Sequence, residues 1–216
     1  MGQGYQIAIE TSAARGSVAL GRAGEALFEE EFELGRRPSE VLMVPLQNAL
    51  NQLDGEAVEL ILIGTGPGSY NGARVGIAAG QGIAIVYQCP VVGLPSPEAL
   101  ALARAGEPCL VLGDARRGVF FTLEIREGKL SGDPDLLDHG KFSARAEEAL
   151  ESGMALVSLE DPARLHLPGL EISQEVPSAG LLLDAWSQRS EEERRELRGR
   201  APEPAYLRPP HITQPK

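Results

Sequence analysis

A predicted helix between residues 72 and 88 contains four glycines, and this feature constrains the fold more than any other in the sequence. Each glycine in a helix interior costs about 1 kcal/mol relative to alanine, so the helix needs a compensating contact. Gly72, Gly76 and Gly80 are spaced four residues apart and therefore lie on one helix face. A face without side chains allows another backbone to approach closely.

This smooth face has two alternative neighbours: a sheet or helix of the same chain, or a second protein. The rest of the helix is also apolar, with Val75, Ile77, Ile83 and Val86 distributed around it. The glycine face and the apolar residues around the rest of the helix would then both have to be buried. One sheet buries only one side of a helix, so the pattern favours a protein partner. A large charged residue at Gly76 is accordingly expected to abolish pairing and to leave the monomer folded.

A second predicted helix, residues 39–53, also has more apolar surface than a single stripe. Ser39 is its candidate N-cap, and Val41, Met43 and Val44 accompany the periodic leucines. Surplus apolar surface indicates contact on two sides. The expected partner interface on the two helices consists of Leu42, Leu46, Ala49, Gly72, Gly76, Ala79, Gly80 and Ile83.

The order of the predicted elements indicates an α/β protein with mixed sheets. Strands at 5–10, 17–20 and 25–34 predict an antiparallel meander whose acidic last strand is typical of a sheet edge. The helix at 39–53, the strand at 60–64, the helix at 71–88 with Asn71 as candidate cap and the strand at 91–94 then predict right-handed crossovers. A short helix capped by Ser96 follows.

A boundary is expected near Gly106, where a second strand-rich section begins. The expected N-terminal lobe covers residues 1–106 and carries the two partner-binding helices. The expected C-terminal lobe covers residues 107–216 and ends in an extended, proline-rich tail. Its predicted strands are 110–114, 119–126 and 155–159, and its predicted helices are 142–150, 178–188 and 191–200.

Composition excludes several classes of function. The 216 residues include 20 basic and 31 acidic side chains, a net charge of −11, which argues against nucleic-acid binding by bulk charge. The stretch 191–200 mixes Arg and Glu and is typical of a solvated helix with i,i+4 pairs; a weak RNA contact is the alternative. No apolar run reaches the length of a membrane span, and the N-terminus lacks a signal-peptide pattern. A cytoplasmic protein is expected.

The glycine-rich loop before the second helix is a candidate phosphate loop, with Gly66, Gly68 and Ser69 as its residues. No lysine follows the last glycine as a P-loop requires, and Pro67 removes one N–H donor. The alternative interpretation is a structural turn.

Other chemistry is sparse. His139, His166 and His211 are scattered and predict no metal site. Asp114 with its neighbouring arginines is better explained as a turn with salt bridges than as an active site. Cys89 and Cys109 are interpreted as small buried hydrophobic residues. No catalytic residue, metal or cofactor is expected.

Five segments, taken together, resemble the TsaB (YeaZ) family over nearly the whole chain. The resemblance implies the actin-like, Hsp70-like ATPase (ASKHA) fold with two related lobes. It also implies a non-catalytic scaffold that pairs with TsaD, the catalytic subunit forming threonylcarbamoyladenosine beside the anticodon of tRNAs, and that acts with the ATPase TsaE. The segments are Ile7–Ser12, Gly64–Gly76, Pro90–Ser96, Asp114–Gly118 and Pro204–Arg208.

In this family, pairing uses the first two helices of the N-terminal lobe, here about 39–53 and 71–88. The resemblance implies contact with tRNA only through the complex. A homodimer is expected when the chain is alone, because an exposed apolar helix pair favours a contact with a second copy. The chain departs from the family at Pro38, where many relatives have histidine, and it lacks the paired metal-binding histidines of TsaD. The turn after Glu10 also lacks the glycine that would admit a phosphate. The alternative is an ATPase or sugar-kinase-like enzyme on the same fold.

Overall fold

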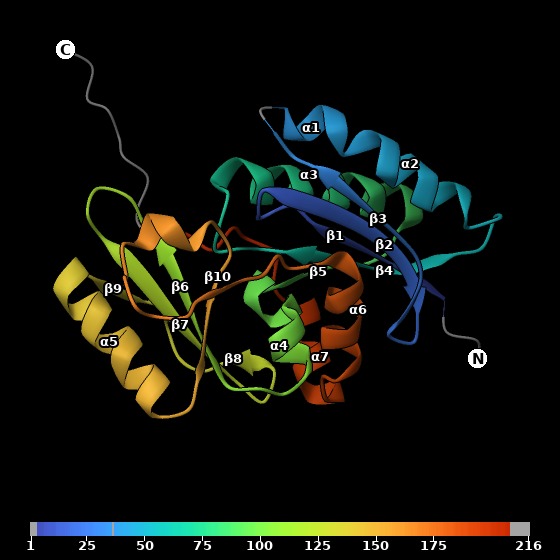
Figure 1. The fold of residues 1–216 in the computed structure, drawn as a ribbon. Helices are drawn as coiled ribbons and strands as arrows, with labels where there is room; N and C mark the ends of the chain where they lie inside the picture. The colour runs from blue at the N-terminus through green and yellow to red at the C-terminus, as the bar shows by residue number, and fades with distance from the viewer. Residues whose placement is uncertain (1–3, 36, 208–216) are drawn as a thin grey trace, which may run out of the picture.

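The computed structural model describes residues 4–35 and 37–207, which form two β-sheets with helices outside and between them (Figure 1). The strand order is β3-β2-β1-β4-β5 in the first sheet and β11-β10-β6-β7-β8 in the second, where β9 also pairs with β7. The strands of the first sheet are β1 (Tyr5–Glu10), β2 (Arg15–Arg22), β3 (Glu25–Glu33), β4 (Val58–Gly64) and β5 (Val91–Leu94). Those of the second are β6 (Cys109–Asp114), β7 (Phe120–Arg126), β8 (Lys129–Leu130), β9 (Asp135–Leu137), β10 (Ala155–Ser158) and β11 (Ser173–Gln174).

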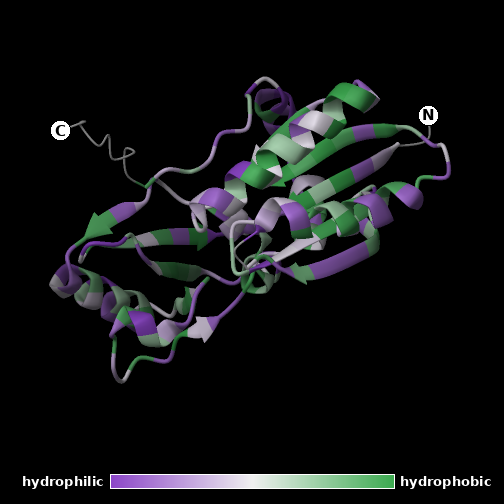
Figure 2. Ribbon diagram, turned by 90° about the horizontal axis from the view of Figure 1, so that it is seen from above, coloured by the Kyte–Doolittle hydropathy of each residue, from purple (hydrophilic) through white to green (hydrophobic). Residues whose placement is uncertain are grey.

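The first sheet is mixed, as predicted. β1 lies at its centre, antiparallel to β2 and parallel to β4, so that Ile7 is opposite both Leu20 and Ile61. These strands are largely hydrophobic (Figure 2) because both of their faces are covered by helices. The acidic strand β3 lies at the edge of the sheet, which confirms that expectation.

The outer face of the first sheet is covered by α1 (Pro38–Val41), α2 (Met43–Asn51) and α3 (Tyr70–Tyr87). The single helix expected at 39–53 is interrupted at Leu42, and no side chain caps α1, so Ser39 is not an N-cap. The N-cap of α3 is Ser69 rather than Asn71, since the Ser69 hydroxyl accepts a hydrogen bond from the Gly72 N–H (3.2 Å). The sequence missed this because Ser and Asn are both good caps.

A middle layer of helices separates the two sheets. The expected short helix after β5 is a 3₁₀ turn η1 (Ser96–Ala99) followed by α4 (Ala101–Arg104), and Ser96 lies inside the turn rather than capping it. α6 (Ala179–Ser187) packs its fully buried Trp186 against the inner face of the first sheet. α7 (Glu191–Arg198) follows, and the predicted i,i+4 spacing occurs in the Arg189–Glu193 pair (3.2 Å), whereas Arg194–Glu191 (2.9 Å) is spaced i,i+3.

The second sheet is covered on its outer face by α5 (His139–Glu151) and by the 3₁₀ turn η2 (Pro162–Leu165). The short strands β8, β9 and β11 were not predicted, because two or three residues are too few to show an alternating pattern. The division at residue 106 stays a prediction. Within the described chain, α6 comes from the expected second lobe and contacts the first sheet.

The end of the described chain is an extended segment, residues 201–207, that we call the strap. Its Ala205 N–H donates to the Thr65 carbonyl (2.9 Å), and its Leu207 packs into the core on the inner face of the second sheet. The predicted tail continues through Arg208 and His211, which lie outside the described residues. Among the helices described, none is both long and apolar enough to cross a membrane.

Candidate functional site

A cleft of about 790 Å³ lies between the two sheets, at the ends of β1, β4, β6 and β10. One wall is formed by the turn after β1 and by the loop that leads into α3. The facing wall is formed by the β6–β7 turn and by residues after β10, and the strap contributes Tyr206 and Leu207. A cleft of this size between two sheets is the first place to look for a bound ligand.

The turn after β1 is embedded in the start of α3. Thr11 Oγ1 donates a hydrogen bond to the Gly72 carbonyl (2.8 Å), and the Ser69 N–H donates to the Ser12 carbonyl (2.5 Å). A Cβ atom added to Gly68 or Gly72 would overlap with the Ser12 or Thr11 carbonyl oxygen. The glycines of the loop and of the start of α3 thus leave room for the backbone of the turn after β1.

The candidate phosphate loop has few donors left for a ligand. The Gly66 N–H donates to Ser96 Oγ (2.9 Å), the Ser69 N–H is used by Ser12, and Pro67 has none. Gly68 is held against the Ser12 backbone. Phosphate binding by this loop stays a prediction, and its hydrogen bonds are those of a structural turn.

Glu10 lies beneath this turn and is completely buried. Its Oε1 accepts a hydrogen bond from the Ser12 N–H (2.6 Å), whereas its Oε2 has no partner among the described residues. Burial raises the pKa of the Glu10 carboxyl, and the neighbouring polar groups of Ser12 and Ser96 oppose that rise only in part. The group does not line the cleft.

The Asp114 turn contributes charged groups to the opposite wall. Asp114 accepts hydrogen bonds from the Arg116 backbone N–H (2.7 Å) and from its guanidinium (3.0 Å). Arg164 pairs with Glu160 (3.2 Å) at the same wall. The salt-bridged turn favoured by the sequence is therefore present, and each charge is compensated by a neighbour. Glu160 and Arg164 were not singled out in the sequence, because nothing in their spacing links them to Asp114.

The histidines and cysteines take structural positions. His139 Nε2 lies 3.1 Å from the His166 carbonyl oxygen, and His211 lies outside the described residues. Cys109 is buried, which raises the pKa of its thiol to about 12, and partial burial raises that of Cys89. Within residues 4–35 and 37–207, no group of three metal-ligating side chains occurs.

The eight predicted interface residues are placed differently from expectation. Seven of them lie in the core of the chain itself, which corrects the prediction that their side chains face a partner. Gly76 and Gly80 approach Thr11 and Ile63, so the smooth face packs on the first sheet. Ala79 alone is partly exposed. The seven are Leu42, Leu46, Ala49, Gly72, Gly76, Gly80 and Ile83.

The outward surface of the same two helices is nevertheless apolar. Ile85 and Val86 on α3 are 79% and 77% exposed, and Met43 and Val44 on α2 are also exposed. On α3, Gly82 also has open space where a Cβ would be. We call these five residues the outer apolar face. Large apolar side chains that are exposed on a pair of neighbouring helices often mark an interaction site.

Comparison with known proteins links this architecture to one family. A family model described as TsaD, tRNA N6-adenosine threonylcarbamoyltransferase, matches residues 33–140. Proteins named tRNA threonylcarbamoyladenosine biosynthesis protein TsaB are 32% identical over 127 residues in Haemophilus influenzae and 29% identical over 127 residues in Escherichia coli. Each match covers 56% of this chain and 54% of the relative, so it spans about half the length of these curated relatives.

Solved structures match over most of the chain. The structure titled YeaZ from Pseudomonas aeruginosa gives a TM-score of 0.68 at 22% identity, covering 94% of this chain and all of that one. A second structure, titled as an uncharacterized protein with similarity to peptidase YeaZ from Pseudomonas aeruginosa, gives 0.70 at 23% identity, with 95% and 100% coverage. This likeness shows a shared fold.

Proposed function

Because the chain belongs to the family described as TsaD, and within it to the TsaB (YeaZ) group, we propose that it is a scaffold subunit in tRNA threonylcarbamoyladenosine biosynthesis. The expected actin-like fold, with two mixed sheets flanked by helices, is confirmed. In this proposal the chain performs no chemistry and instead binds the catalytic subunit TsaD. TsaE then joins the pair, and tRNA is contacted through the complex.

The outer apolar face is the observation that carries the proposal. It belongs to the two helices through which the family pairs, and a catalytic subunit of the same fold offers a similar helix pair. Burial of apolar area at about 25 cal/mol per Å² gives such a contact its driving force. In the absence of TsaD, a second copy of this chain covers the same face and forms a homodimer.

Two features of the cleft support a role without catalysis. The turn after β1 packs against the start of α3, and the Gly66 and Ser69 N–H groups of the loop donate hydrogen bonds within the chain. The charged groups of the facing wall are paired with one another. With a net charge of −11, contact with tRNA needs positive charge from a partner.

The test is light scattering on a sizing column, with the chain alone and mixed with TsaD from the same organism. We expect a homodimer that TsaD converts into a one-to-one complex. Val86→Glu is expected to prevent both, because it places a charge in the apolar contact. Leu150→Glu, at an exposed leucine of α5 on the second sheet, is the matched control and should leave both intact. A Val86→Glu protein that still binds TsaD would refute this docking face.

The rival function is an ATPase or sugar-kinase-like activity, which the presence of a cleft between two lobes favours. Calorimetric titration of the isolated chain with magnesium and ATP distinguishes this enzyme function from the scaffold function. The scaffold proposal predicts no saturable heat. Saturable binding followed by phosphate release would favour the enzyme instead.

A further inference from the structure

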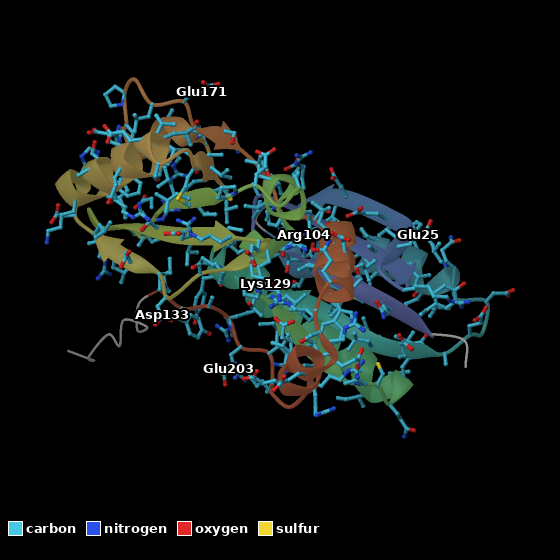
Figure 3. All side chains as sticks on the ribbon, turned by 90° about the horizontal axis from the view of Figure 1, so that it is seen from below. Glu25, Arg104, Lys129, Asp133, Glu171 and Glu203 are labelled. Atoms are coloured by element: carbon cyan, nitrogen blue, oxygen red, sulfur yellow. The ribbon has the colours of Figure 1, made fainter. Side chains whose placement is uncertain are left out.

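A cluster of charged side chains joins the two sheets at the end of the second sheet that lies away from the cleft. β6 and β7 run antiparallel, with Asp114 and Phe120 at the cleft and with Cys109 and Ile125 at the opposite end. The turn from β7 into β8 continues from this opposite end. Figure 3 shows Arg104 and Lys129 there, beside the C-terminal helices. We call the five residues Glu98, Arg104, Lys129, Arg189 and Glu193 the lobe clamp.

The clamp is centred on a buried ion pair. The side chains of Glu98, in η1, and Arg189, between α6 and α7, are 4% and 11% exposed, and they form a direct salt bridge. The second oxygen of Glu98 accepts the backbone N–H of Leu130 in β8 (3.1 Å). One carboxylate therefore binds the link after the first sheet, the C-terminal helices and the second sheet together.

Arg104 and Lys129 also connect the second sheet to the helices, on either side of the Glu98–Arg189 pair. Arg104, at the end of α4, hydrogen-bonds to the Gly128 carbonyl in the β7–β8 turn and to Gln188 Oε1 (2.9 Å) after α6. Lys129 of β8 reaches Glu193 of α7 (2.5 Å), which also pairs with Arg189 (3.2 Å). The Arg104–Gly128 and Lys129–Glu193 contacts join the β7–β8 hairpin to α4 and α7. The Arg104–Gln188 and Arg189–Glu193 contacts connect the helical segments with one another.

The strap provides a second attachment at the cleft end. Tyr206 packs against Tyr70 at the start of α3, with tilted rings whose centroids are 5.4 Å apart, and the adjacent Leu207 packs against the core of the second sheet. The second sheet is thus attached to the first sheet and its helices at both ends. Two-lobed proteins that close on a ligand instead rotate about a few hinge residues.

We propose that the lobe clamp and the strap hold the two sheets at one fixed angle, so that the cleft keeps a single width instead of opening and closing. Charged hydrogen bonds are directional, and buried polar groups can contribute a unique geometry more than net stability. The inference does not depend on the proposed partner, because every contact in it lies within this chain.

The proposal is tested by double electron–electron resonance on the full chain. Cys89→Ser removes the partly exposed thiol, and spin labels are attached to cysteines introduced at Gln47 of α2 and Glu147 of α5, which are both exposed. The labelled protein is diluted into an excess of unlabelled protein, so that the recorded distances lie within one chain of the homodimer proposed above. The unaltered clamp should give a single narrow distance distribution, with or without magnesium and ATP. Two populations in this protein would overturn the proposal.

Glu98→Gln combined with Arg189→Met removes both charges of the central pair and keeps an acceptor for the Leu130 N–H. We expect the distribution to become at least twofold wider, with the circular dichroism spectrum of a folded protein. Arg200→Gln, which removes the exposed Arg200–Glu196 pair, is the control and should leave the width unchanged. A folded double variant with an unchanged narrow distribution contradicts the proposal.

If the double variant does not fold, Lys129→Met replaces it. This change removes only the partly exposed Lys129–Glu193 contact, so the protein is expected to fold, and the distribution should again widen. An unchanged width in this variant then overturns the proposal.

Discussion

The two faces of α3 are built from similar residues and have opposite roles. On the inner face, Gly72 and Gly76 lie against Thr11 of the β1–β2 turn, at a distance that no side chain would permit. On the outer face, Gly82 has no neighbour, and Ile85 and Val86 are exposed. Glycine spacing alone therefore does not locate an interface. The inner glycines allow close packing on the sheet, and the outer face offers apolar area for a partner.

The largest effect is expected when the same substitution is placed on each face. Gly76→Glu puts a side chain and a charge against Thr11 in the core, which should destabilise the fold by about 4 kcal/mol or more. Gly82→Glu should leave the fold within about 0.5 kcal/mol of the parent and affect only pairing. Urea unfolding followed by circular dichroism measures both. A stable Gly76→Glu monomer would restore the expectation from the sequence and contradict the packing seen here.

Glu10, beneath the inner face, should make stability depend on pH. Its pKa is raised in the folded protein by burial, so the folded state retains the proton to higher pH than the unfolded chain. Stability is then greatest below the unfolded pKa, near 4.5, and falls as pH rises through the folded pKa. Glu10→Gln should remove this decline.

The measurement is the unfolding midpoint of Glu10→Gln and of the parent protein between pH 4 and pH 8. The two midpoints are expected to agree best at pH 4 and to diverge as the pH rises, with the variant more stable. Parallel curves over the whole range would show that Glu10 ionises without cost.

A smaller loss of stability is expected when the hydrogen bond between the β1–β2 turn and α3 is removed. Thr11→Val preserves the shape of the side chain but leaves the buried Gly72 carbonyl without this donor. The expected cost is about 1–2 kcal/mol in the free energy of unfolding. Thermal melts of Thr11→Val and Thr11→Ser discriminate the hydroxyl from the packing, since serine keeps the donor. Equal losses in both would assign the effect to packing.

The smallest effect should be a gain in stability from a substitution on the outer face of α3. Gly82→Ala adds a Cβ into open space in a helix interior, and the higher helix propensity of alanine should stabilise the protein by about 1 kcal/mol. The same change at Gly72 should destabilise it, because the Cβ overlaps with the Thr11 carbonyl. Comparing the two alanine variants by urea unfolding tests the difference between the faces most directly.

Much of the fold could be predicted from local patterns. The continuous apolar run at Leu60–Gly64 indicated a strand buried on both faces, and the acidic run near Glu30 indicated an edge strand; both are confirmed. The residue that caps each helix was harder to predict from the sequence. Ser69 and Asn71 are both competent N-caps, and the choice between them depends on where the backbone turns to meet Ser12.

The candidate site was harder to predict than the fold. The sequence marked two helices as unusual and assigned the glycine face of one of them to a partner, whereas that face packs on β1 and β4. It also gave no sign that Glu98 and Arg189, 91 positions apart, form a buried pair. Residues so far apart in the chain show no spacing pattern from which a contact between them could be predicted.

The sequence by itself determined the alternation of strands and helices, the apolar surfaces of α2 and α3, and the absence of a nucleotide-binding fingerprint in the Gly64–Ser69 loop. These are properties of residue type and short-range spacing. Only the tertiary structure decided which face of α3 is inside, which donors of the loop remain free, and how the second sheet is attached to the first. Those outcomes depend on contacts between segments that are distant in the chain, and their geometry is set by how the two sheets and the helices between them pack.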